Sequence, residues 1–309
     1  MAETLSPDAP GADAPARDMA AALASCGTTL TRQALRLVAP EAALRRCDPE
    51  VVHDLRVATR RLRASLRLYR DLLRKRDRCR LVRPLRRLTR LLGGLRQAAV
   101  GRALLAELGP DLPPSLLPAC RRCLEVLDLR LARHCVLVCR RLDGRRLRRL
   151  REAVFAVAGP LLVGTEGAAS ADQRLKAWVL PRLQVEVAAW RAALPGRAAP
   201  LETWHRFRVA SKRLRYALEA GAPADEEGFG PALVALRELQ EVLGRQHDHV
   251  ALAADLEDVV RSLARLGATA ELTGARQLAA LVRARGAAID AVPTMDAASA
   301  ALVRTAALT

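Results

Sequence analysis

Aromatic residues are scarce in this sequence: Phe, Trp and Tyr together make up only 3% of its 309 residues. Its core must therefore be built from Leu, Ala and Val, which dominate the 51% of residues that are hydrophobic. This apolar fraction excludes wholesale disorder. Because Ala, Leu and Arg are strong helix formers, the composition favours an all-α fold.

Lysine and acidic residues are scarce as well. Only Lys75, Lys176 and Lys212 are lysines, so 48 of the 51 basic residues are arginine, against 33 acidic residues. GC-rich coding sequence accounts for most of the preference for Arg over Lys, but not for where the charges lie. Residues 45–102 carry a net charge of +14, whereas residues 220–309 carry −4. The total of +18 favours a polyanionic partner, and its uneven distribution predicts a localised electropositive site.

The sequence lacks an apolar signal segment and any run of 18 uncharged apolar residues. A secretion signal and a membrane span are therefore not expected, and we predict a cytoplasmic protein with no membrane partner. Residues 1–18 are acidic and contain several Pro and Gly, which predicts a disordered lead. Residues 291–309 are low in complexity and are predicted to form a frayed tail.

The seven cysteines are an odd number, which favours reduced thiols. Cys120 and Cys123 precede His134, Cys135 and Cys139, a combination that resembles a metal cluster. However, residues 116–142 are predicted to form one continuous helix. Cys123 and His134 would then lie about 16 Å apart along its axis, too far to share one zinc ion. We therefore predict buried apolar thiols, with no metal and no cofactor.

Apolar residues recur at helical spacing almost throughout, and no alternating strand pattern is present. The pattern predicts helices at residues 19–38, 49–73, 84–108, 116–142, 145–157, 171–194, 201–220, 231–266 and 270–289. Residues 159–170, rich in Gly and small residues, form the best candidate for an internal linker. The main domain is thus expected to span residues 19–290, with a first half at about 19–158 and a second at about 171–290.

An internal repeat is the most informative feature of the chain. Residues 52–63 return as residues 204–215, with His, Arg, Val, Ala, a hydroxyl residue, two cations, Leu and Arg in the same register. A weaker match follows at Leu92-Gly93 and Leu243-Gly244. The repeat predicts two similar helical halves related by duplication.

Each copy of the repeat places its cations along one narrow strip of a helix, which we call a basic ridge. At 100° per residue, the ridge positions fall within about 80° of arc, beside the apolar stripe. The first basic ridge comprises His53, Arg56, Arg60, Arg63 and Arg67. The second basic ridge comprises His205, Arg208, Lys212 and Arg215.

Repulsion between the like charges of a ridge destabilises its helix by a few tenths of a kcal/mol per pair, and a bound anion would remove this repulsion. The alternative interpretation is that each ridge is a basic helix face exposed to solvent and binds nothing. The histidines either donate to phosphate or make structural hydrogen bonds. Arg61 and Arg213 either join the ridges or pair with acids on a neighbouring helix. One face of the following helix carries further cations that would widen the site: Arg83, Arg86, Arg87 and Arg90.

The pattern H-x-x-R-V-A-[ST]-[RK]-R-L-R, present twice and each time followed by Leu-Gly, resembles the CHAD family, the conserved histidine α-helical domains. The resemblance covers about residues 20–290. It implies an all-α fold of two four-helix-bundle-like halves with pseudo-twofold symmetry around a basic central pore. It also implies binding of inorganic polyphosphate and, for some members, association with polyphosphate granules. The matched positions are His53, Arg56, Arg60, Arg61, Arg63, His205, Arg208, Lys212, Arg213 and Arg215.

The chain departs from the family in its second element, L-G-x-x-R-D-x-D-V. The first copy, residues 92–100, has lost both acids, whereas the second copy retains Asp248. His247, Asp248 and His249 would form a metal or acid–base site, but adjacent helical residues point 100° apart. A solvent-facing or helix-pairing role is therefore favoured for them.

Two other functions are alternatives to polyphosphate binding. A nucleic-acid-binding protein is disfavoured, because no aromatic residue recurs in both ridges to stack on bases. A polyphosphate-processing enzyme is less favoured still, because the E-x-E-x-K signature of fused triphosphatase domains and a Walker-type glycine loop are both missing. We therefore predict a non-enzymatic protein without catalytic residues. The sequence leaves the oligomeric state open.

Overall fold

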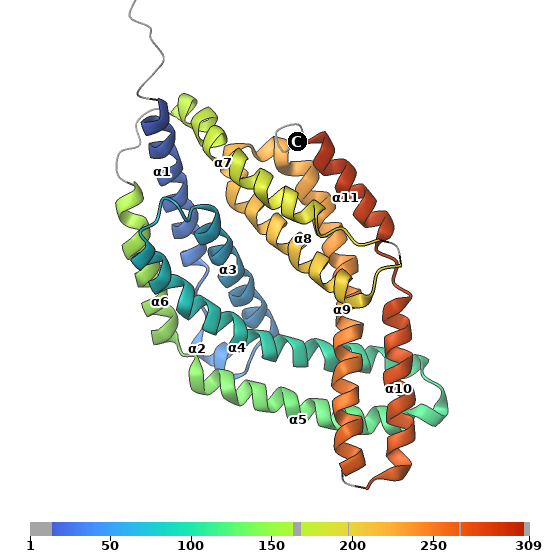
Figure 1. The fold of residues 1–309 in the computed structure, drawn as a ribbon. Helices are drawn as coiled ribbons and strands as arrows, with labels where there is room; N and C mark the ends of the chain where they lie inside the picture. Colours follow the sequence, from blue (N-terminus) through green and yellow to red (C-terminus); the bar gives the residue numbers. More distant parts are fainter. Residues whose placement is uncertain (1–13, 163–167, 197, 266, 306–309) are drawn as a thin grey trace, which may run out of the picture.

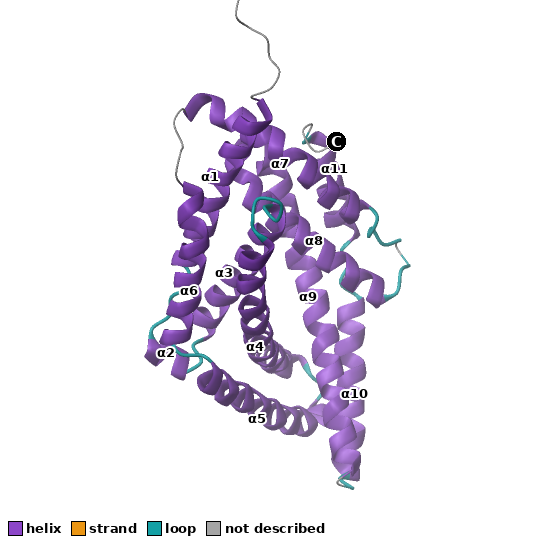
Figure 2. Ribbon diagram, turned by 60° about the vertical axis from the view of Figure 1, so that its left-hand side comes forward, coloured by secondary structure: helices purple, strands orange, loops and turns teal. Residues whose placement is uncertain are grey.

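The computed structural model describes residues 14–162, 168–196, 198–265 and 267–305. Throughout these ranges the regular structure is helical and no strand occurs, which confirms the all-α prediction (Figure 2). The α-helices are α1 (Ala14–Leu35), α2 (Glu41–Arg45), α3 (Pro49–Leu68), α4 (Lys75–Leu108), α5 (Leu117–Arg141), α6 (Gly144–Ala158), α7 (Ala168–Arg191), α8 (Leu201–Gly221), α9 (Glu226–Arg265), α10 (Thr269–Ala287) and α11 (Val292–Arg304). Short 3₁₀ turns lie at Gly109–Asp111, Pro114–Leu116, Gly159–Leu162 and Ala222–Ala224.

The start of α3 is set by local sequence. The Asp48 side chain accepts hydrogen bonds from the backbone N–H groups of Glu50 (3.0 Å) and Val51 (3.3 Å), and Pro49 occupies the first helical position. An aspartate cap followed by proline satisfies donors that would otherwise lack partners. This cap fixes where α3, the helix that carries the first basic ridge, begins.

The order of helix contacts repeats in the two halves. Helix α3 packs on α4 and α4 on α5, just as α8 packs on α9 and α9 on α10. The halves meet where α3 packs against α8, α1 against α7 and α4 against α9 (Figure 1). A fourth such pair is α5 with α10, so the two halves are joined along most of their length.

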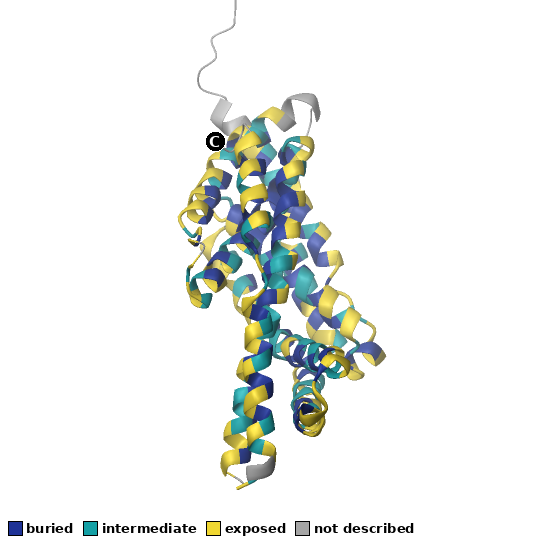
Figure 3. Cartoon of the chain, turned by 90° about the vertical axis from the view of Figure 1, so that its right-hand side faces the viewer, coloured by how far each residue is buried: buried dark blue, intermediate teal, exposed yellow. Residues whose placement is uncertain are grey.

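Two hydrophobic clusters hold this arrangement. The larger one draws on both halves, including Leu55 and Leu62 of α3 and Phe207 and Leu214 of α8, all with no exposed surface. The smaller one joins the far ends of α4, α5, α9 and α10. In Figure 3, buried residues follow the contact surfaces and exposed residues the outer faces. Because the larger core crosses between the halves, they form one folded unit.

The ends of the chain differ from the prediction. Residues 14–18, expected to belong to the disordered lead, lie in α1; residues 1–13 lie outside the described residues. The frayed tail predicted for residues 291–309 is wrong over residues 292–304, which form α11. Its buried residues are Met295, Ala298, Ala301 and Leu302, so this Ala-rich segment packs against the core despite its low complexity.

Two internal predictions were also inaccurate. Helices α4 and α9 begin before Pro84 and Pro231, their predicted first residues, and both prolines lie inside the helices. In α4 the proline leaves only the carbonyl of Arg80 without its usual donor, and Arg80 is exposed to water. The predicted linker is shorter than expected, because Gly159–Leu162 is a 3₁₀ turn and α7 starts at Ala168. Residues 163–167 lie outside the described residues.

In the part of the chain that the structure describes, no helix has both the length and the apolar character that a bilayer crossing requires.

Candidate anion-binding site

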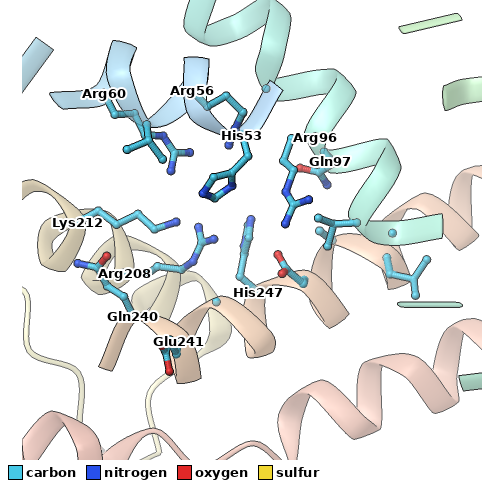
Figure 4. Close-up of a pocket in the computed structure, with 18 of the residues that line it drawn as sticks. His53, Arg56, Arg60, Arg96, Gln97, Arg208, Lys212, Gln240, Glu241 and His247 are labelled. Carbon is cyan, nitrogen blue, oxygen red and sulfur yellow. The ribbon is translucent and has the colours of Figure 1, made fainter. Parts of the chain in front are cut away.

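A cavity with a volume of about 630 Å³ lies between α3, α4, α8 and α9, and we call it the central cavity. The basic ridges contribute His53, Arg56 and Arg60 from α3, and Arg208 and Lys212 from α8. In Figure 4, side chains from all four helices converge on a common space. The other polar residues of the lining are Thr89, Arg96, Gln97, Gln240, Glu241, His247, Asp248 and Asp255.

The lining of the central cavity follows the internal repeat. Arg56 and Arg60 of α3 are equivalent to Arg208 and Lys212 of α8, and all four line the cavity. In the second repeat element, the equivalent pairs are Thr89 and Gln240, Gly93 and Gly244, Arg96 and His247, and Gln97 and Asp248. Equivalent residues of the two repeats therefore line the same cavity. This is the arrangement expected if two related halves face each other across a shared axis.

Five cations line the central cavity: Arg56, Arg60, Arg96, Arg208 and Lys212. Burial, together with the nearby charges of Arg60 and Arg96, lowers the pKa of Arg56 to about 10. Burial also lowers the pKa of Lys212, to about 7, and the charges of Arg208 and Arg60 add to the effect. Such shifts arise when like charges are held together out of water.

These cations form no ion pair with a carboxylate in the described part of the chain, although the charge of Asp248 acts on Arg208 and Lys212. Among the described residues, no carboxylate lies within 4.0 Å of any of the five, as the ion pairs of the chain show. Arg208 Nε is buried without a hydrogen-bond partner in the same part of the chain. Of the lining acids, Asp255 pairs with Arg130 of α5 at 3.1 Å. Burial raises the pKa of Asp248, although Arg208 and Lys212 oppose the shift. The acids of the lining thus offset only part of the positive charge of the five cations, and an outside anion can neutralise the rest.

A glycine makes room for one of these guanidinium groups. A Cβ atom added to Gly93 of α4 would lie 3.3 Å from Arg56 Nη1, closer than an ordinary van der Waals contact. Glycine at this position lets the Arg56 side chain pass alongside α4 into the cavity. In the first half, the glycine of the repeated Leu-Gly element is therefore explained by the space that the Arg56 side chain needs.

The two repeated histidines occupy different places. His53 lines the central cavity, whereas His205 lies in a neighbouring pocket, its ring centroid 5.0 Å from that of His247. Burial and the nearby charges of Arg208, His205 and Lys212 lower the pKa of His247 to about 4. His247 is therefore neutral at pH 7.

Sequence reasoning missed His247 and Asp248 as cavity residues. The role favoured for them, solvent-facing or helix-pairing, did not place them in the central cavity, which both line, but the contact between the rings of His247 on α9 and His205 on α8 agrees with helix pairing. The signal was available: they stand three and four residues after Gly244, just as Arg96 and Gln97 follow Gly93.

Three predicted arginines are neutralised by carboxylates. Arg61 of α3 and Arg215 of α8 both pair with Glu219 of α8, at 2.9 Å and 2.8 Å. Arg213 hydrogen-bonds to Glu186 of α7 at 2.8 Å. Arg61 and Arg213 therefore take the pairing alternative. Arg215 of the second basic ridge is paired as well, because Glu219 lies one turn beyond it on α8 and also reaches Arg61 of α3.

The remaining predicted residues lie outside the central cavity. Arg63 and Arg67 continue the first ridge along α3, and burial together with Arg67 and Arg86 lowers the pKa of Arg63. Arg87 and Arg90 line a separate cavity between α4, α5 and α6. Arg87 and Arg90 therefore do not line the central cavity, and their contact with polyphosphate stays a prediction.

In the described ranges, no group of three or more His, Cys, Asp or Glu side chains is arranged to hold a metal ion. Helix α5 contains the predicted single stretch, with Cys120 and Cys123 buried in the smaller hydrophobic cluster and His134 further along. All seven cysteines are free.

Comparisons with known proteins agree with this architecture. The CHAD-domain family model matches residues 28–257. The chain is similar to the crystal structure of the CHAD domain from the plant Ricinus communis, with 23% identity, a TM-score of 0.59, and 96% of this chain and 95% of that chain covered. It is also similar to PptA from Streptomyces chartreusis, with 21% identity, a TM-score of 0.60, and 92% and 97% covered. No match was found among proteins of curated function.

The matched region contains both copies of the repeat and all four helices that line the central cavity apart from the last turns of α9. The two solved structures extend the likeness in fold to nearly the whole chain. On these grounds the protein belongs to the CHAD-domain family.

Proposed function

We propose that this protein binds inorganic polyphosphate in the central cavity. The observation that carries the proposal is the group of five cations from three helices that have no carboxylate partner in the described part of the chain. Guanidinium groups fit phosphate oxygens with two parallel hydrogen bonds. A chain of phosphates supplies several such groups at a regular spacing and neutralises all five cations together.

The dimensions of the site agree with a chain that passes through it. A volume of about 630 Å³ lies in the usual range for small-ligand sites, so it holds a few phosphates rather than a long polymer. Arg63 and Arg67 offer further charge along α3 outside the cavity. We propose that a longer chain continues along this strip.

The lining also favours an inorganic chain over a nucleic acid. No Phe, Tyr or Trp lines the central cavity, and single-stranded nucleic acids are normally bound on aromatic side chains that stack on the bases. Nucleic acid remains the second candidate, because its phosphates would meet the same guanidinium groups. We propose further that binding is not accompanied by catalysis, since the sequence carries neither signature of phosphate-processing enzymes named above.

The test is a pair of charge reversals with a matched control. Arg60→Glu with Lys212→Glu removes two cavity cations, and each hydrogen bond to a charged group is worth about 1.5–3 kcal/mol. We expect the affinity for long-chain polyphosphate, measured by isothermal titration calorimetry, to fall at least about 100-fold. Arg237→Glu with Arg276→Glu changes the net charge equally on exposed surface outside the cavity, and we expect a change below about threefold.

Three outcomes would contradict the proposal. Equal loss in both double variants would mean that net charge, not the central cavity, attracts the ligand. Displacement of polyphosphate by single-stranded or duplex DNA at physiological salt would favour the nucleic-acid alternative. Release of orthophosphate in the presence of Mg²⁺ would show that the protein is an enzyme. Circular dichroism of each variant checks that the helix content is unchanged.

A further inference from the structure

A second cavity lies on another face of α4, enclosed by α4, α5 and α6, with a volume of about 780 Å³. Two adjacent glycines of α4 show that the helix has one face toward each cavity. The Cβ position of Gly93 faces Arg56 of the central cavity, whereas that of Gly94 lies 2.7 Å from His134 Cε1 in the second cavity. Since adjacent side chains on a helix point about 100° apart, α4 is a wall shared by the two cavities.

The second cavity is built differently from the central one. Its inner surface is aliphatic and its other residues are mainly arginines, and the lining contains neither an acidic residue nor a Phe, Tyr or Trp ring. The aliphatic part comprises Pro84, Leu88, Leu91, Leu137, Leu142, Leu147 and Leu150. The charged part comprises Arg87, Arg90, Arg141 and Arg146.

The arginines of this cavity are not neutralised by the fold. In the ranges that the structure describes, no carboxylate lies within 4.0 Å of Arg87, Arg90 or Arg141, all of which are exposed. Arg146 is engaged by its own helix start, where its guanidinium contacts Asp143 and the carbonyl of Arg141. Three guanidinium groups beside a leucine surface are therefore available to a ligand.

We propose that the second cavity binds an anionic amphiphile with a single alkyl chain, its phosphate or carboxylate head on the arginines and its chain on the leucines. Inorganic polyphosphate has no apolar part to cover the leucine surface. A nucleotide would place its base there, but the lining offers no aromatic ring to stack on it. An alkyl chain matches the aliphatic surface, and burial of that surface adds affinity in proportion to chain length.

The test uses a series of n-alkyl phosphates from butyl to decyl, titrated below their micelle concentrations by isothermal titration calorimetry. We expect the affinity to rise about fourfold for each added CH₂, the value for a fully buried methylene, until the cavity is filled. Arg90→Gln with Arg141→Gln removes two partners of the phosphate head and should lower the affinity for decyl phosphate at least about tenfold. The same variant should bind long-chain polyphosphate as the wild type does.

The central-cavity variant Arg60→Glu with Lys212→Glu is the matched control, and it should bind decyl phosphate normally. This makes the inference independent of the proposed function, because each cavity has its own ligand and its own variant. Affinity that does not change with chain length, or decyl phosphate binding that survives Arg90→Gln with Arg141→Gln, would overturn the inference. So would loss of polyphosphate binding in that variant, since the two arginines would then belong to the first site.

A bilayer is the other source of such a ligand, and a vesicle experiment separates the two. Vesicles of phosphatidylcholine with phosphatidic acid present the same phosphate head, but their chains remain in the membrane. We expect monomeric decyl phosphate to bind and the vesicles not to retain the protein at physiological salt. Retention on vesicles without binding of monomeric decyl phosphate would contradict a cavity that takes up the chain.

Discussion

Lys212 makes polyphosphate binding depend on pH in a direction that the structure specifies. Burial, with Arg208 and Arg60 nearby, holds its pKa at about 7 in the free protein. A bound polyanion reverses the effect of the neighbouring cations and favours the charged ammonium, so the complex keeps the proton to higher pH. Between these two pKa values, binding takes up one proton, and affinity must fall as pH rises.

The size of the effect follows from the pKa of about 7. The protonated fraction of Lys212 in the free protein is about one quarter at pH 7.5 and about one hundredth at pH 9. If only the protonated form binds fully, the Kd for long-chain polyphosphate rises about 25-fold over this window. The Arg56 guanidinium, with a pKa of about 10, remains about nine-tenths charged at pH 9 and contributes little.

Other groups around Lys212 limit where the experiment is performed. The charged and titratable side chains lining the same cavity are His53, Arg56, Arg60, Arg96, Arg208, Glu241, His247, Asp248 and Asp255. A window from pH 7.5 to 9 lies above the ordinary range of histidine and carboxylates. The internal phosphates of a long chain also stay ionised throughout it, so Lys212 is the group that changes charge.

The assay is calorimetric titration at several pH values in buffers of different ionisation enthalpy, which reports proton uptake directly. We expect uptake of nearly one proton per site at pH 8.5 and a Kd that rises steadily from pH 7.5 to 9. Lys212→Arg, which stays charged, should abolish most of the proton uptake and reduce the change in Kd to below about threefold. A flat profile in the wild type, or an equal slope in Lys212→Arg, would refute the reasoning.

Three further predictions concern the surrounding structure and are checked by urea denaturation or calorimetry. Glu219→Gln leaves two part-buried arginines without a partner and should lower the free energy of unfolding by about 3 kcal/mol. Asp128→Asn breaks an exposed ion pair and should lower it by less than 1 kcal/mol. Equal effects of the two variants would contradict the argument from burial. Phe207→Ala removes a ring with no exposed surface and should cost about 3–5 kcal/mol, and a loss below 1 kcal/mol would mean that the core collapses around it. Gly93→Leu places a side chain where Arg56 lies and should weaken polyphosphate binding about tenfold with helix content unchanged; unaltered binding would remove Arg56 from the site.

Much of the fold could be predicted from the sequence, because long amphipathic helices carry a strong period. The predicted helix 116–142 corresponds closely to α5, and the two copies of the repeat, residues 52–63 and 204–215, lie within α3 and α8. Helix starts were less predictable where proline stood near them. Proline is favoured in the first turn but is tolerated further in when the carbonyl it leaves unpaired faces water. The Ala-rich α11 was missed because its burial depends on contacts with α9, which no local pattern reveals.

The candidate site was only half predictable, and the reason is geometric. A helical wheel places Arg56, Arg60 and Arg63 on one strip, but only the first two reach the central cavity. Which part of a ridge faces a cavity depends on how α3 crosses α8, and that crossing also brings Arg61 to Glu219, whereas the packing of α7 on α8 brings Arg213 to Glu186. These two contacts join residues far apart in the chain, so no spacing within one helix predicts them, unlike the pair of Arg215 and Glu219, which stand four residues apart on α8.

The central cavity is also a place where the fold gives up stability. Five cations held together with no carboxylate at ion-pair distance repel one another, and the lowered pKa values of Arg56 and Lys212 reflect burial together with that repulsion. If stability alone had been selected, we would expect a glutamate to neutralise each of these cations. Arg61, Arg213 and Arg215 are neutralised in this way, by a glutamate from an adjacent helix turn or a neighbouring helix. The contrast between paired arginines at the edge and unpaired cations at the centre, within the same two repeats, is what a site for an external anion requires. It follows that long-chain polyphosphate should stabilise the folded protein more strongly than the same ionic strength of a simple salt, because only a bound polyanion relieves all five charges at once.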